Sequence, residues 1–164
     1  MRLEEEKWTF VYAARDADLA NNFLAGLRKA SGRMGVKVGE PDWIELEGNR
    51  ADDYLNGFRG IRNTSQIVLV LLFNDKDKHK LKNCIDNRIG VPSQFVLGRT
   101  ADRATKALAV AGNILKQMNA KVKKDLYRMN FSGIDGTMVV GVNAVNHAKG
   151  MIFALVSTYS STLS

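Results

Sequence analysis

The chain has 164 residues, 45% of them hydrophobic and 25% charged, a composition typical of a globular domain rather than a disordered segment. It holds no apolar run of about 18 residues, and it begins with the acidic stretch MRLEEEKWTF, so we expect neither a membrane span nor a signal peptide. The net charge of +7 favours an anionic partner, and the single cysteine excludes an internal disulfide. A reduced cysteine fits the cytoplasm or the nucleus.

Strands and helices alternate along the first half of the chain. Aromatic and β-branched residues predict a strand at 8–14, and Asp16 is the expected N-cap of the helix that follows. A short strand is predicted at 36–38, before a Gly-Glu-Pro turn, and a helix at 51–62. Residues 67–73 (IVLVLLF) form a continuous apolar run, which is typical of a central parallel strand covered on both faces.

The alternation continues beyond this apolar run. A helix is predicted over KHKLKNCID, a strand at 93–97 (SQFVL), and then the longest helix of the chain, which is expected to begin after Thr100 and to run through Met118. The pattern predicts an α/β domain with a Rossmann-like, mostly parallel sheet flanked by helices. Ligands of such sheets lie beyond the carboxyl ends of the strands, where the sequence places the loop 74–77 and the end of SQFVL.

The pattern changes in the last part of the chain. Residues 137–145 and 151–158 read as two strands joined by NHAKG, and hence as an antiparallel hairpin. Two strands alone cannot bury both faces, so we expect this hairpin to be the start of a second, incomplete domain.

Polar side chains at helical spacing predict an anion site. Lys78 and Lys82 are four residues apart on one predicted helix, and Gln117 and Lys121 are four apart on another, so each pair shares a face. Gln94 lies on the short strand between them. Cations and amides from separate elements suit a small, highly charged anion such as a terminal phosphate. The alternative is that the lysines are solvated, Gln94 is an edge-strand residue and Gln117 an exposed helix position.

Three segments resemble the Argonaute family, and specifically its Piwi branch. They are IVLVLLFNDKDKHKLKNCIDNRIGVPSQFVL, NILKQMNAK, and TMVVGVNAVNHAKG with IFALVSTYSSTLS, in the family's order and at compatible spacing. The resemblance implies that residues 1–128 form a MID domain, which holds the 5′ end of a guide RNA. It also implies that residues 129–164 are the N-terminal part of the RNase H-like Piwi domain, whose remainder would be a partner.

The resemblance assigns roles to individual residues. Lys82, Gln94 and Lys121 match positions that contact the 5′-phosphate of the guide. Gln117 stands where the Piwi branch has glutamine, a choice that accompanies a Mg²⁺ ion bridging the guide phosphates. The positions that match the segment sensing the first base are Asn74, Asp75, Lys76 and Lys78.

The sequence departs from the family at positions that matter for function. Lys78 stands where a tyrosine usually stacks on the first base, and Val122-Lys123-Lys124 replaces the usual residues after the second phosphate lysine. Asn143 occupies the position of the first catalytic aspartate, and a neutral amide is a poorer ligand than a carboxylate for a pair of Mg²⁺ ions. We therefore expect no catalysis by this chain, although a full-length relative would be an endoribonuclease.

Together these features predict a module that binds the 5′-monophosphate end of a small, piRNA-like guide RNA in RNA-mediated silencing. Two alternatives remain open from the sequence. One is a part of an RNA-guided endonuclease whose cleavage site is incomplete here. The other is a Rossmann-like domain that binds a mononucleotide or a protein, although no G-x-G-x-x-G or G-x-x-x-x-G-K-[ST] loop follows a predicted strand.

Overall fold

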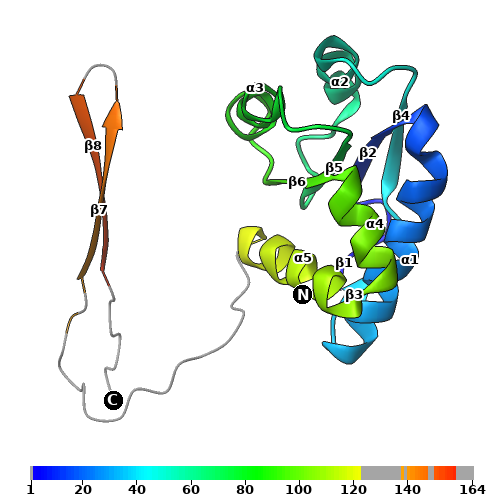
Figure 1. The fold of residues 1–164 in the computed structure, drawn as a ribbon. Coiled ribbons are helices and arrows are strands. Elements are labelled where there is room, and N and C mark those ends of the chain that lie inside the picture. The colour runs from blue at the N-terminus through cyan, green and yellow to red at the C-terminus, as the bar shows by residue number, and fades with distance from the viewer. Residues whose placement is uncertain (1, 123–137, 139, 148–149, 158–164) are drawn as a thin grey trace. The chain divides into compact units, whose positions relative to one another are not determined.

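The structure is a computed structural model that describes residues 2–122, 138, 140–147 and 150–157. The chain divides into two compact units, Met1–Leu126 and Tyr127–Ser164. The first unit holds a four-stranded sheet and all of the helices described, and the second holds a β-hairpin (Figure 1). No helix within the described residues is long and apolar enough to cross a membrane.

The sheet of the first unit is parallel throughout, with the strand order β4-β2-β5-β6. Its strands are β2 (Thr9–Ala13), β4 (Asp42–Leu46), β5 (Val68–Leu72) and β6 (Ser93–Leu97). A separate parallel pair joins β1 (Arg2–Leu3) to β3 (Lys37–Val38). β2 and β5 lie inside the sheet, and β6 is an edge strand.

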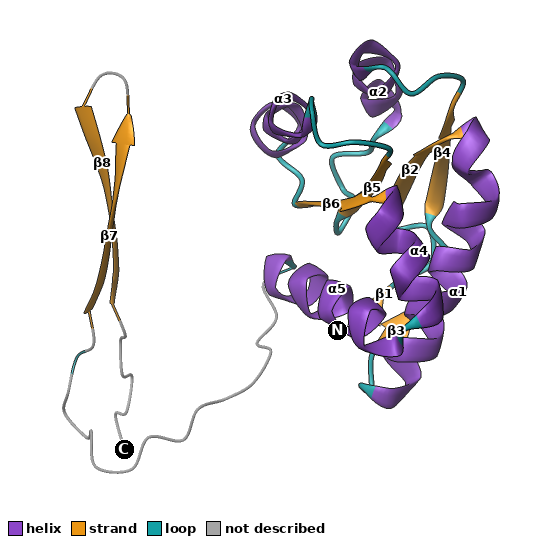
Figure 2. Ribbon diagram, in the orientation of Figure 1, coloured by secondary structure: helices purple, strands orange, loops and turns teal. Residues whose placement is uncertain are grey.

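Helices cover both faces of this sheet (Figure 2). They are α1 (Ala17–Arg33), α2 (Ala51–Gly57), α3 (Lys78–Asn83), α4 (Gly98–Lys106) and α5 (Leu108–Lys121). The residues Cys84–Ile89 continue α3 as a π-helical segment, and Phe58–Gly60 continue α2 as a 3₁₀ turn. One face is covered by α1, α4 and α5, and the other by α2 and α3.

The apolar run at β5 shows how the two cores form. Successive side chains of a strand point to opposite faces, so Leu69 and Leu71 join the core under α1 and α5, whereas Val68 and Val70 join the core under α2 and α3. All of these side chains are buried. The predicted α/β class, the parallel sheet and the central strand are therefore confirmed.

The predicted single helix after Thr100 is wrong, because the chain forms two helices that meet at Ala107. Ala107 has an extended backbone, with φ −125° and ψ 105°. Its N–H donates to the carbonyl of Arg103 at 2.8 Å, which ends α4, and its own carbonyl accepts from the N–H of Val110 at 3.0 Å, which begins α5. The N-cap of α4 is Leu97, so Thr100 lies inside that helix, and the longest helix is α1.

Other differences concern short or polar elements. β4 was not predicted, because its sequence DWIEL is half-buried at the edge of the sheet and follows a turn. The helix at 51–62 stops being α-helical at Gly57. Asp16 stands at the N-cap of α1, but its carboxylate makes no capping hydrogen bond. Phe73, predicted as part of the central strand, follows β5 and is 62% exposed.

The second unit contains the predicted hairpin. β7 (Val140–His147) and β8 (Gly150–Ser157) pair in antiparallel register, with Asn143 opposite Ala154. Every side chain described in β8 is exposed. Residues 123–137 and those after Ser157 lie outside the described residues, and with them Lys123, Lys124 and the predicted strand ends at 137 and 158.

Candidate anion-binding site

The edge strand β6 presents polar groups to both of its faces. Phe95 packs in the core that also holds α2 and α3, and Val96 packs in the core that holds α5. Strand alternation therefore turns Ser93 toward the α3 side and Gln94 toward the α5 side. Both side chains are buried, and Gln94 is only 6% exposed. A buried amide at the edge of a sheet needs partners from another element.

The partners of Gln94 come from α5. Its Oε1 accepts a hydrogen bond from Lys121 Nζ at 2.8 Å, and its Nε2 donates to Gln117 Oε1 at 3.1 Å. Nε2 also lies 3.2 Å from the carbonyl of Phe95. Gln117 and Lys121 share one face of α5 because they are four residues apart, as their spacing predicted.

The partners of Ser93 come from α3 and the π-helical segment. Lys82 forms an ion pair with Asp86, and its Nζ lies 3.4 Å from Ser93 Oγ. Ser93 Oγ donates to the second carboxylate oxygen of Asp86 at 2.5 Å. Lys121 also reaches Ser93, since its Nζ donates to the Ser93 carbonyl at 2.7 Å. Two ammonium groups from opposite faces of the sheet thus meet at one residue of the edge strand.

The electrostatics of Lys121 reflect this convergence. Burial lowers the pKa of the Lys121 ammonium, and the positive charges of Lys82 and, less strongly, Lys78 lower it further. The carboxylate of Asp86 acts in the opposite direction. Positive charges that lower the pKa of Lys121 lie close enough to it to attract a common anion.

Within the described residues, the predicted first-base segment makes no side-chain hydrogen bond with Lys82, Gln94, Gln117 or Lys121. Asn74 follows β5, and its Oδ1 accepts from the N–H of Lys76 at 3.1 Å, while the N–H of Lys78 donates to the carbonyl of Asp75 at 3.1 Å. Lys78 begins α3 and is half-buried. Asn74 and Asp75 line a hollow of about 420 Å³ with Leu97 at the end of β6. This hollow lies at the carboxyl ends of β5 and β6, where the sequence places the ligands of such a sheet.

Three features of this region were missed from the sequence. Asp86 and Ser93 complete the hydrogen bonds around Lys82, and the spacing of four residues from Lys82 to Asp86 was the available signal. The third is a contact between Arg15 and Phe73. The Arg15 guanidinium lies 4.1 Å from the centre of the Phe73 ring, a cation–π pair between the ends of two neighbouring strands. No sequence spacing reveals that contact.

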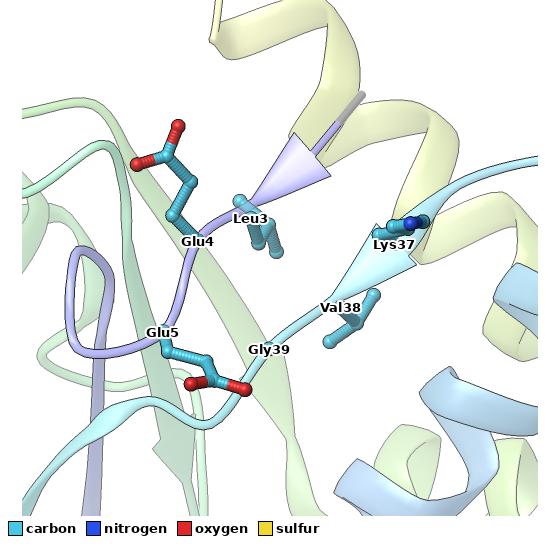
Figure 3. Close-up of a pocket in the computed structure, with 6 residues that line it drawn as sticks. All are labelled: Leu3, Glu4, Glu5, Lys37, Val38 and Gly39. Carbon is cyan, nitrogen blue, oxygen red and sulfur yellow. The ribbon is translucent and has the colours of Figure 1, made fainter.

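A second hollow, of about 660 Å³, lies beside β1 and β3 (Figure 3). Leu3, Val38 and Gly39 form its apolar part, and its charged side chains are Glu4, Glu5 and Lys37. Two carboxylates and one ammonium do not suit a phosphate. The hollow therefore does not compete with β6 as an anion site.

The described side chains alone do not form a metal site. Nowhere in the described part of the chain do three His, Cys, Asp or Glu side chains gather around a point that could hold a cation. The oxygen of Gln117 is a single neutral ligand that already accepts from Gln94. In β7, Asn143 is exposed, and the described residues of the hairpin include no carboxylate.

Comparisons with known proteins place the chain among relatives of one kind. No protein-family model matches it. It is 30% identical to the Piwi-like protein 1 of Danio rerio over 97% of this chain and 19% of that protein. It is 29% identical to the Piwi-like protein 1 of Gallus gallus over 84% of this chain and 16% of that protein. The protein argonaute-3 of Drosophila melanogaster is 24% identical over 94% of this chain and 19% of its own length.

The crystal structure of Drosophila Piwi has the same fold. It superposes with a TM-score of 0.74 at 18% identity, over 92% of this chain and 24% of that one. The chain spans about a fifth of the length of the curated relatives it matches. Over most of its own length, this chain is therefore a homologue of the Piwi and Argonaute proteins.

Proposed function

We propose that this chain binds the 5′-phosphorylated end of a small guide RNA, as a MID module does, and thereby takes part in small-RNA-guided silencing. The observation that carries the proposal is the meeting of Lys82, Gln94 and Lys121 at the edge strand β6, with Gln117 hydrogen-bonded to Gln94. Homology to Piwi and Argonaute proteins supports the silencing role.

The chemistry of a terminal phosphate suits these groups. Such a phosphate carries up to two negative charges and three strong acceptor oxygens, whereas an internal phosphodiester carries one charge. Each ammonium has three N–H donors. The described partners of Lys121 occupy two of its donors, and those of Lys82 occupy two as well. Each lysine therefore retains one N–H for a ligand, and the phosphate charge would favour the protonated form of Lys121.

The first base of the guide would then extend toward the segment Asn74, Asp75, Lys76 and Lys78. The turn at Asn74 and Asp75 leads directly into α3, which also carries Lys82. One short element therefore bears both the base-contacting candidates and a phosphate-contacting lysine. Lys78, which the residue pattern grouped with Lys82, fits the base end of the site better than the phosphate end.

A Mg²⁺ ion beside Gln117 is the part of this proposal that the side chains support least. The protein offers one amide oxygen there and no carboxylate cluster among the described residues, so its groups alone do not fit the ion. Phosphate oxygens would have to supply most of the ligands. Binding of 5′-phosphorylated RNA with Mg²⁺ and with a chelator, at equal ionic strength, tests this; equal affinities would show that Gln117 acts without a metal.

The decisive experiment compares two RNAs of one sequence, one with a 5′-monophosphate and one with a 5′-hydroxyl. We expect tighter binding of the phosphorylated RNA, and we expect Lys82→Ala to remove about 1.5–3 kcal/mol of that binding, the range for a hydrogen bond to a charged group. Lys106→Ala is the matched control, because Lys106 also pairs with an aspartate on its own helix but lies on α4, among exposed residues. Equal binding of both RNAs would reject the proposal.

A further inference from the structure

Within the part of the chain that the structure describes, Asp86 is the one carboxylate that lies among the cations at β6. It belongs to the π-helical segment Cys84–Ile89, one turn beyond Lys82. Insertions of this kind in a helix are frequent at functional sites, because they redirect side chains without ending the helix. Here the segment carries a negative charge to the place where the proposed function requires a phosphate.

Both oxygens of Asp86 are engaged. One accepts from Lys82 Nζ in a close ion pair, and the other accepts from Ser93 Oγ at 2.5 Å. The hydroxyl of Ser93 therefore holds the carboxylate in place, and Ser93 is itself fixed in the edge strand and only 1% exposed. The side chains of Lys82 and Asp86 are 39% and 30% exposed, so the pair is only partly screened by water.

The two lysines of the site, Lys82 and Lys121, differ in the charge of their partners. Lys121 donates to two neutral oxygens, those of Ser93 and Gln94, and no ion pair of Lys121 occurs among the described residues. Lys82, by contrast, is already paired with the carboxylate of Asp86. The charge of Asp86 also reaches Lys121, where it opposes the effect of burial on the pKa of the ammonium. In the absence of ligand, Asp86 is thus the counter-ion of the whole site.

Resting on the proposed function, we infer that Asp86 is an internal competitor of the RNA 5′-phosphate, which occupies Lys82 in the free protein and sets the affinity of the site. A phosphate can use Lys82 fully only by displacing or repelling this carboxylate, and like charges brought together oppose binding. The net gain in affinity is therefore the difference between the interaction of the phosphate with Lys82 and the existing interaction of Asp86 with Lys82. Weakly charged ligands gain little from such a site, so the carboxylate limits adventitious anion binding.

The test is Asp86→Asn, which removes the charge and keeps the size and an acceptor oxygen for Ser93. We expect 5′-phosphorylated RNA to bind several-fold more tightly to this variant. Glu40→Gln is the matched control, because Glu40 also forms an ion pair, with Arg28 at 2.6 Å, and its removal changes the net charge equally. The Glu40 side chain is 48% exposed and precedes β4 at the opposite edge of the sheet, so we expect the affinity of this variant to stay within about twofold of the parent protein.

A double-mutant cycle separates competition at Lys82 from a general charge effect. In a Lys82→Ala background, Asp86→Asn should give no more gain in affinity than Glu40→Gln does. An Asp86→Asn variant that binds no better than Glu40→Gln, in a parent protein that prefers 5′-phosphorylated RNA, would overturn this inference alone. A parent protein with no such preference would overturn the proposed function as well. Urea unfolding of each variant confirms that folded proteins are compared.

Discussion

β6 and β7 both carry amide side chains in mainly apolar strands, and the surroundings of Gln94 on β6 differ from those of Asn143 on β7. Gln94 on β6 is 6% exposed and is hydrogen-bonded to Lys121 and Gln117 of α5. Asn143 on β7 is exposed, and its neighbour in register is Ala154. A separate helix therefore brings complementary groups to Gln94, whereas no side-chain hydrogen bond of Asn143 occurs among the described residues.

The same comparison holds for the apolar side chains of the two units. Leu69 on β5 is fully buried between β2, β6 and the helices, whereas Leu155 on β8 is 72% exposed. Both lie in apolar runs of similar composition. The apolar pattern of a strand therefore predicts a surface that needs cover, and only the sheet of the first unit has that cover among the described residues.

The largest expected effect tests this difference in cover. Leu69→Ala should lower the free energy of unfolding by about 2–5 kcal/mol, since it removes buried methyl groups and leaves a cavity. Leu155→Ala, the matched change on β8, should cost less than about 0.5 kcal/mol, because the side chain is exposed. Urea denaturation followed by circular dichroism measures both. A loss above about 2 kcal/mol for Leu155→Ala would show that β8 is covered in solution.

The next effect tests the two amides. Gln94→Ala should weaken the binding of 5′-phosphorylated RNA by about 1.5–3 kcal/mol, because it removes the acceptor that orients Lys121 and the donor that holds Gln117. Asn143→Ala should leave the affinity unchanged. Fluorescence anisotropy with a labelled RNA measures both. Equal losses in the two variants, or none in either, would remove the distinction between Gln94 and Asn143.

Local patterns were enough to predict three of the four strands of the sheet, β2, β5 and β6, and to nominate candidate site residues, but not the contacts that join them. The uninterrupted run VLVLL predicts a central strand because only a strand covered on both faces tolerates it. The break at Ala107 has no such signal: no Gly or Pro stands there, and the apolar spacing continues across it. The resemblance singled out Lys82, Gln94 and Lys121. Ser93 contacts both Lys82 and Lys121 because β6 pairs at the edge of the sheet, and spacing along the chain does not encode that pairing.

A smaller effect follows from the lowered pKa of Lys121. Phosphate binding favours the protonated ammonium, so affinity should fall as the pH rises through this pKa, which lies below the ordinary lysine value of 10.5. Lys121→Arg keeps its charge over the whole range. Its affinity should therefore decline less between neutral pH and about pH 10 than that of the parent protein. An oligomer of adenine and cytosine avoids base deprotonation in this range. Parallel declines would show that Lys121 does not contact the phosphate.

The smallest expected effect concerns Asn143. Cleavage of a phosphodiester by two metal ions needs several carboxylates around cations about 4 Å apart. Asn143→Asp would supply one carboxylate on a hairpin whose described residues include no other, and it faces Ala154 across the strand pair. We therefore expect the purified 164-residue chain to leave a complementary RNA intact, with Mg²⁺ and a 5′-phosphorylated guide, both before and after this substitution. Gel electrophoresis of the target RNA measures this. Guide-directed, metal-dependent cutting by either form would show that the hairpin obtains further carboxylates from elsewhere in the chain.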